Sequence, residues 1–191
     1  MEIDALLSKR IRELRKARRH TLEQLAELSG VSRSMISLIE RQETSPTATV
    51  LDKLAGALGV ALSSLFSEDK QELQLSRHAD QQLWTDPATG YVRRQVSPRG
   101  LSSPLDLIEV SFPPGETVVF EGVSRQVAIH QQIWLLEGEM QISVDAQTWQ
   151  LLDGDCLAME LGQQIVFHNP GRQPARYVLA QTTSTSTMRK P

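Results

Sequence analysis

The feature that most constrains the fold is a change of hydrophobic period near residue 66. Up to that point apolar residues recur every three or four positions, as in Ile3, Leu7, Ile11 and Leu14, which is the period of amphipathic helices. Beyond it, short apolar segments alternate with turn clusters such as DPATG, SPRG, LEGE and NPG, which is typical of antiparallel strands. The 191 residues suffice for two small domains. We therefore expect an all-α domain followed by an all-β domain.

The helical part contains capping residues that set the ends of its central helices. Thr21 and Ser32 are predicted N-caps, because their hydroxyls can accept hydrogen bonds from free backbone N–H groups. They would start a second helix over residues 22–28 and a third over residues 33–41. Gly30 suits the positive φ with which many helices end.

Two further helices are predicted before the change of period. Ser45 is a candidate N-cap and Pro46 suits the first helical position, so a fourth helix would run from there to about Leu58. A short fifth helix over residues 62–66 would close the core. The prediction for this part of the chain is a five-helix domain.

The second and third helices together predict a helix-turn-helix. Ile36 and Ile39 would face the core and leave the other side of the third helix exposed. The first residues of such a helix contact base edges in the major groove, and Arg33 can donate two hydrogen bonds to a guanine. Basic residues nearby suit phosphate contacts. The predicted DNA-binding residues are Arg18, Arg19, Thr21, Ser32, Arg33, Ser34, Ser37, Leu38 and Arg41.

The distribution of charge favours DNA contact through the first domain alone. The whole chain has a net charge of −3. Residues 1–66 carry ten Lys and Arg against eight Asp and Glu, whereas the remaining residues carry ten against fifteen. Of the ten basic residues in 1–66, seven lie between Lys9 and Arg19 inclusive. A mildly basic domain joined to an acidic one indicates that only the first meets phosphate.

Over residues 8–66 the chain resembles the XRE family of phage-repressor-like regulators. The resemblance rests on the order of the helices, with ELSGVS at the turn, IER at the end of the third helix and SP before the fourth. The resemblance implies binding to a double-stranded DNA operator. Leu22 stands where many members have Gln, so no base contact is expected there, and Gln42 stands where Gly is frequent. Two alternatives stay open: antitoxin-like binding of another protein by the same helices, and a basic face that is merely solvated.

The strand-forming part carries a second pattern. The segment IWLLEGEM suits a strand and a turn, and Gly154, Gly162 and Asn169 recur at a spacing similar to the second motif of the cupin superfamily. This resemblance covers roughly residues 105–182 and implies a double-stranded β-helix, or jelly-roll, barrel. The predicted organisation is a helix-turn-helix domain over 1–66, a linker over 67–82, a cupin-like β-barrel over 83–182 and a flexible tail over 183–191.

The cupin resemblance does not extend to the usual metal ligands. A cupin metal site uses three imidazoles and a carboxylate. Gln131 stands at the carboxylate position and Ile165 at a histidine position of these motifs. His130 and His168 each lie one residue from a ligand position, so they would face the other side of their strands and are weak candidates. We expect no metal, no cofactor and no catalytic residue, although a rearranged metal site and a cupin enzyme with an autoregulatory DNA-binding domain stay open.

The mouth of the predicted barrel is the place for a small-molecule effector. A carboxylate beside a guanidinium would suit a zwitterion, so the predicted effector is an amino acid or a related metabolite. Trp134 and Trp149 are expected to be core residues more often than stacking partners. The alternative for this domain is a dimerisation role alone. The predicted effector-binding residues are Glu121, Arg125, Gln131, Trp149 and Glu160.

These patterns together predict a transcriptional regulator, a repressor in the first instance, that works as a homodimer. One recognition helix contacts few base pairs, so two are expected on half-sites roughly one helical turn apart. The single cysteine, Cys156, excludes an intrachain disulfide. No apolar run is long enough to cross a membrane, and the charged first residues do not resemble a signal peptide. We therefore expect a cytoplasmic protein without membrane contact.

Overall fold

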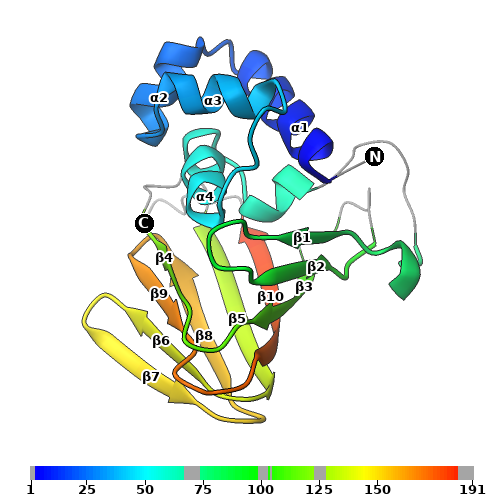
Figure 1. Cartoon of the computed structure of the whole chain (residues 1–191), viewed down its shortest axis with the longest axis vertical. Coiled ribbons are helices and arrows are strands. Elements are labelled where there is room, and N and C mark those ends of the chain that lie inside the picture. Colours follow the sequence, from blue (N-terminus) through cyan, green and yellow to red (C-terminus); the bar gives the residue numbers. More distant parts are fainter. Residues whose placement is uncertain (1–2, 67–73, 99–102, 104, 123–127, 185–191) are drawn as a thin grey trace, which may run out of the picture.

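The computed structural model describes residues 3–66, 74–98, 103, 105–122 and 128–184 and has a helical part above two antiparallel sheets (Figure 1). In the helical part, α4 lies between the other helices and the sheets. The described helices of this part are α1 (Ile3–Ala17), α2 (Leu22–Ser29), α3 (Arg33–Glu40), α4 (Ala48–Ala57) and the 3₁₀ helix η1 (Leu62–Phe66).

The caps predicted for α2 and α3 have the expected geometry. The Thr21 hydroxyl accepts from the backbone N–H of Gln24, whose side chain accepts in turn from the backbone N–H of Thr21. Gly30 ends α2 with a φ of 68°, and the Ser32 hydroxyl accepts from the N–H of Met35 to start α3. The turn between the two helices is therefore set by local chemistry.

The predicted start of the fourth helix is wrong by two residues. The N-cap of α4 is Thr47, whose hydroxyl accepts from the N–H of Val50, and not Ser45. The Ser45 hydroxyl instead donates to the Asp4 carboxylate at 2.6 Å. Because α1 engages that hydroxyl, the helix begins at the next residue able to cap it.

The predicted fifth helix is not an α-helix. Residues 62–66 form the 3₁₀ helix η1, in which bonds connect residues three apart, as in the turn that enters it from Ser64 N–H to the Ala61 carbonyl. Such a tighter, shorter helix lets Leu65 and Phe66 both reach buried positions. Residues 3–66 thus contain four α-helices and the 3₁₀ helix η1 in place of the five helices predicted.

The second part of the chain forms two facing antiparallel sheets. The larger sheet has the order β1-β2-β3-β10-β5-β8 and the smaller the order β4-β9-β6-β7. Without the β1–β2 hairpin, these are two four-stranded sheets whose order is that of a jelly roll. The strands are β1 (Leu83–Thr85), β2 (Val92–Gln95), β3 (Leu105–Phe112), β4 (Thr117–Phe120), β5 (Ala128–Glu137), β6 (Met140–Val144), β7 (Gln147–Leu151), β8 (Cys156–Leu161), β9 (Ile165–His168) and β10 (Ala175–Ser184).

Strand alternation decides which side chains fill the space between the sheets. On β5, Ile129, Gln131 and Ile133 are buried, whereas the alternate residues His130 and Trp134 are exposed. A period of two is expected for a strand with one face toward a core. Trp134 is 52% exposed, so the expectation that it is a core residue is wrong.

The two parts of the molecule are joined at the first turn of α4. The buried Asp86 carboxylate, in the turn between β1 and β2, accepts from the N–H of Ala48, the first residue of α4. It also accepts from the backbone N–H and the hydroxyl of Thr89. A carboxylate at a helix N-terminus satisfies a free donor and complements the helix dipole. Phe66 of η1 adds an edge-on contact with Trp84 of β1 at 5.7 Å.

The segments at the predicted domain ends are only partly described. Residues 67–73 of the predicted linker and 185–191 of the predicted tail lie outside the described residues, and 78–80 form a 3₁₀ helix, η2. The tail was predicted to begin at residue 183, but β10 continues pairing with β5 through Ser184. Among the helices that are described, none has the length and apolar character needed to cross a membrane.

Replacing Asp86 with alanine is expected to lower the free energy of unfolding by about 3 kcal/mol, because three donors lose a charged, buried acceptor. Chemical denaturation of the full chain measures this. Asp155→Ala is the matched control, since that carboxylate accepts from one exposed N–H, that of Leu152. Equal losses in the two variants would contradict the role given to Asp86.

Candidate DNA-binding face and effector cavity

The recognition helix α3 is fixed at its C-terminal end by an ion pair with α1. Arg15 donates from Nε and Nη2 to the two carboxylate oxygens of Glu40, at 2.6 and 2.7 Å. Both side chains are largely buried, and the hydrogen bond to Glu40 raises the pKa of Arg15. Arg15 also donates to the His20 carbonyl before α2. One guanidinium therefore connects α1, the start of α2 and the end of α3.

The N-terminal half of α3 is the exposed part of this helix. Ser32, Arg33, Ser34 and Met35 are exposed, while Ser37 and Leu38 are half-buried. Ile36 and Ile39 are fully buried, as their spacing predicts. Met35 was missed by the sequence prediction: it lies one turn before the buried Ile39, yet its side chain is exposed beside Ser34.

Exposed ion pairs hold two of the candidate arginines in the free protein. Arg33 pairs with Glu23 at the start of α2, at 2.5 Å. Arg41 donates to both carboxylate oxygens of Glu43 and to the Ser37 hydroxyl, and the hydrogen bond to Glu43 raises its pKa. Such exposed pairs contribute little and are screened by salt, so DNA can replace them.

The candidate phosphate contacts lie before α2. Arg18 is half-buried, and Arg19 is exposed with a φ of 58°, which turns the chain from α1 into α2. The Thr21 hydroxyl accepts within the capping box and is also a hydrogen-bond partner of the Glu23 carboxylate. Gln42, after α3, has a φ of 63°, the conformation that explains why glycine suits this position.

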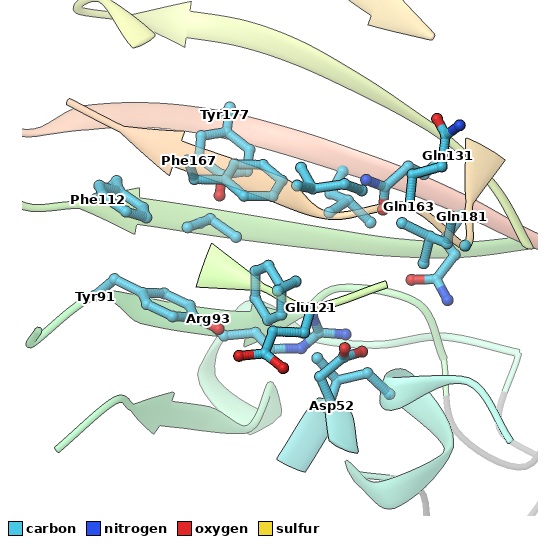
Figure 2. Close-up of a pocket in the computed structure, with 17 residues that line it drawn as sticks. Asp52, Tyr91, Arg93, Phe112, Glu121, Gln131, Gln163, Phe167, Tyr177 and Gln181 are labelled. Carbon is cyan, nitrogen blue, oxygen red and sulfur yellow. The ribbon is translucent and has the colours of Figure 1, made fainter. Parts of the chain in front are cut away.

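A cavity lies between the two sheets and opens toward the helical part (Figure 2). Most of its walls are apolar and come from the strands, while Asp52 of α4 and Leu62 of η1 complete it. The centre of a water molecule can occupy about 60 Å³ of it, so it suits a small molecule. The other lining residues are Tyr91, Arg93, Val110, Phe112, Phe120, Glu121, Gln131, Leu161, Gly162, Gln163, Ile165, Phe167, Tyr177, Leu179 and Gln181.

The polar groups of this cavity are few and most are deeply buried. In the view of Figure 2, the rings of Tyr91 and Tyr177 lie toward one end and the side chains of Gln131 and Gln181 toward the other. Burial raises the pKa of both tyrosines, which therefore stay neutral. Burial lowers the pKa of Arg93, whose guanidinium lies 5.1 Å from the centre of the Phe66 ring.

The structure brings only part of the predicted effector set to this cavity. Glu121 and Gln131 line it. Trp149 packs against the core of the smaller sheet, and Glu160 lies on the outer face of the larger sheet beside His130. Neither lines the cavity: Glu160 projects from the outer face of its sheet, and Trp149 lies on the edge strand β7 of the smaller sheet. Arg125 lies outside the described residues.

The two candidate histidines have other partners. Nδ1 of His130 is 3.2 Å from the Glu160 carboxylate on the outer face of the larger sheet. Nδ1 of His168 is 3.0 Å from the Thr117 hydroxyl and 3.1 Å from the Glu116 carbonyl, in the smaller sheet. Among the described residues, no three His, Cys, Asp or Glu side chains gather in a way that could hold a metal ion.

The sequence prediction missed the residues that join the cavity to the helical part. Asp52 and Arg93 are both buried, and the charge of a residue in a helix or strand does not tell which other part of the chain will cover it. The pair Arg93-Arg94 did carry one hint, since adjacent residues of a strand face opposite sides and one arginine had to face inward.

Comparisons with known proteins agree with this architecture. A helix-turn-helix family model, HTH_3, matches residues 11–65. The HTH-type transcriptional regulator PuuR of Escherichia coli is 30% identical over 180 residues, which cover 93% of this chain and 95% of PuuR. The chain belongs to the XRE family of helix-turn-helix transcriptional regulators.

Two further relatives extend the likeness over both parts of the chain. The regulator SutR of Escherichia coli is 24% identical over 172 residues, covering 90% of this chain and 91% of SutR. The crystal structure of an HTH_3 family transcriptional regulator from Vibrio cholerae superposes with a TM-score of 0.77 at 23% identity, over 94% of this chain and 96% of that one. This XRE-family chain therefore has the same two-part fold as that regulator.

Replacing Glu40 with glutamine is expected to lower the free energy of unfolding by about 3 kcal/mol, because it leaves the buried Arg15 cation without its anion. Urea denaturation followed by circular dichroism measures the change. Glu43→Gln removes an exposed partner of Arg41 and is expected to leave stability nearly unchanged. A similar effect of both substitutions would argue against the proposed fixing of α3.

Proposed function

We propose that this transcriptional regulator binds a pseudo-palindromic operator through the N-terminal half of α3. The observation that carries the proposal is the exposure of this half of the helix on the side away from the sheets (Figure 1). Arg33, Ser34 and Ser37 are the proposed base contacts, with Leu38 available for a thymine methyl group. The proposed contacts near the phosphates are Arg18, Arg19, Thr21, Ser32 and Arg41.

The cavity between the sheets is the proposed effector site. Apolar walls with a few deeply buried polar groups are typical of sites for small metabolites. Glu121 and Gln131 remain proposed contacts, whereas Trp149 and Glu160 are left out because they do not line the cavity. The proposed role is sensing and not catalysis, with an amino acid or a related metabolite as the effector.

The position of the cavity supports coupling between effector and DNA. Asp52 and Leu62 belong to the helical part, so a bound molecule would touch elements of both parts. Lys53 of α4 also pairs with Glu121 at the cavity, at 3.4 Å. An effector changes DNA affinity only if it prefers one arrangement of the DNA-binding domains. We propose repression that the effector relieves in this way.

Arg33→Ala is expected to weaken binding to the operator by about 1–3 kcal/mol and to relax specificity at one base pair, because it removes a bidentate base contact. Arg18→Ala is expected to weaken binding to all DNA sequences alike, because it removes a phosphate contact. It should also reduce the slope of log affinity against log salt concentration by about one. The measurement is fluorescence anisotropy on an operator selected from random duplex DNA, repeated at several salt concentrations.

Arg172→Ala is the control for this experiment, since Arg172 is exposed in the loop between β9 and β10. Its affinity for the operator should equal that of the unaltered protein. Selection that yields no preferred sequence, or a preferred sequence unchanged by Arg33→Ala, would overturn the proposed mode of binding.

The outer face of the larger sheet is the proposed contact with a second copy of the chain. Trp134, on β5 next to the edge strand β8, pairs with Val178 of β10 and Cys156 of β8, and Leu105 at the start of β3 is 42% exposed. An exposed tryptophan among small and apolar side chains is typical of protein interfaces. A pseudo-palindromic operator requires two DNA-binding domains, and this face lies on the part that does not contact DNA.

Trp134→Ser is expected to shift the protein from dimer to monomer, because it removes the largest apolar side chain of this face. Sedimentation velocity at several protein concentrations gives the result. Leu152→Ser is the control, since this leucine is 62% exposed in the turn between β7 and β8. An unchanged dimer in Trp134→Ser would place the interface elsewhere.

A further inference from the structure

Arg93 is a buried cation in the wall of the cavity. It lies on β2, where the side chains of Arg93 and Gln95 face inward while that of Arg94 faces outward. Arg94 is close to Glu109 on the neighbouring strand, as is usual for a surface arginine. Arg93 is only 5% exposed. Bulk water therefore does not reach most of its guanidinium and cannot replace a missing hydrogen-bond partner there.

The two donors of one edge of this guanidinium have no partner. Nε and Nη2 of Arg93 are buried and make no hydrogen bond to any described residue. A buried and unpaired charged donor is costly, and a native protein that keeps one requires a reason for it. The guanidinium lies over the face of the Phe66 ring, which stabilises its charge. This contact provides no hydrogen-bond acceptor for Nε and Nη2.

The same edge binds carboxylates elsewhere in this molecule. Arg15 uses Nε and Nη2 for the two oxygens of Glu40, and Arg41 uses Nε and Nη2 for the two oxygens of Glu43. The planar guanidinium matches a carboxylate with two parallel hydrogen bonds. The free edge of Arg93 therefore has the geometry for a carboxylate that the described chain does not supply.

A second unpaired donor belongs to the same cavity. Nε2 of Gln181, on β10, is buried without a hydrogen-bond partner among the described residues, and Gln181 lies opposite Gln131 of β5 in the register. The remaining walls are mainly apolar but include the carboxylates of Asp52 and Glu121, and the space is small. This combination suits a carboxylate on a short organic molecule and leaves no room for a large phosphate ester.

We propose that the effector is a small carboxylic acid or amino acid whose carboxylate binds Nε and Nη2 of Arg93. This inference rests on the proposed effector site. Arg93 contacts Phe66, the last residue of η1. A carboxylate bound to Arg93 would therefore lie beside the junction between the sheets and the helical part. Arg93 thus anchors the ligand at the place where its presence reaches the DNA-binding helices.

The test uses acetate, the smallest carboxylate with an apolar group, and the full-length protein with ¹⁵N-labelled arginine. The Nε–H resonance of Arg93 is identified by its absence in Arg93→Met. Acetate is expected to shift this resonance in a saturable manner, whereas chloride at the same ionic strength is not. A resonance that does not move, or that moves equally with chloride, overturns the proposal.

Thermal denaturation of two variants completes the test. Without acetate, Arg93→Met is expected to melt no lower than the unaltered protein, because it removes a buried cation whose Nε and Nη2 make no hydrogen bond. With acetate, the rise in Tm is expected to vanish in Arg93→Met and to persist in Arg94→Met, the matched control on the other face of β2. A large loss of stability in Arg93→Met without acetate would show an internal partner and overturn the proposal.

The outcome for the carboxylate is distinct from the outcome for DNA. Operator binding by the unaltered protein without acetate tests the regulator function on its own. If the protein binds DNA sequence-specifically but Arg93 does not respond to acetate, the carboxylate proposal fails and the proposed regulator function stands. If Arg93 responds to acetate but the protein prefers no DNA sequence, the carboxylate site stands and the proposed operator binding fails.

Discussion

The hydrogen bond between the Asp86 carboxylate and the first N–H of α4 is the contact on which the arrangement of the whole molecule depends. It joins a turn of the larger sheet to the start of α4, which lies between the sheets and α1 to α3. A buried carboxylate at a helix N-terminus is both directional and strong, so it sets position as well as distance. The cavity exists as a two-part site because α4 and η1 are held over the open end of the sheets.

Charge is used in two different ways along this chain. Arg15 and Glu40 form a closed pair that positions the recognition helix, and neither has capacity left for a ligand on the shared edge. Arg93 has the same chemistry but no internal anion at that edge. A satisfied buried pair rigidifies a fold, whereas an unsatisfied buried donor leaves a defined place for a partner. The first positions the helix proposed to bind DNA, and the second suits the proposed regulation by a small acid.

Local chemistry explains why the helix-turn-helix could be predicted closely. Thr21, Gly30 and Ser32 act through atoms within a few residues, so their roles follow from the printed order of residues. The start of α4 was misplaced because the Ser45 hydroxyl bonds to Asp4, a residue 41 positions earlier. The fifth helix became a 3₁₀ helix because Leu65 and Phe66 must fill buried positions set by other elements. Each error reflects a contact between distant parts of the chain.

The sequence by itself determined the two fold classes, the capped helix pair, the exposed half of α3 and the inward position of Gln131, since all of these follow from periodicity and local hydrogen bonds. Only the tertiary structure decided that Arg93 and Asp52 belong to one cavity, that Trp149 and Glu160 do not, and that Trp134 is exposed. Strand order and domain contact depend on pairing between distant segments, and a strand's own residues do not specify its neighbours. The proposed effector cavity therefore depends on topology, and the proposed DNA-binding face depends on local sequence.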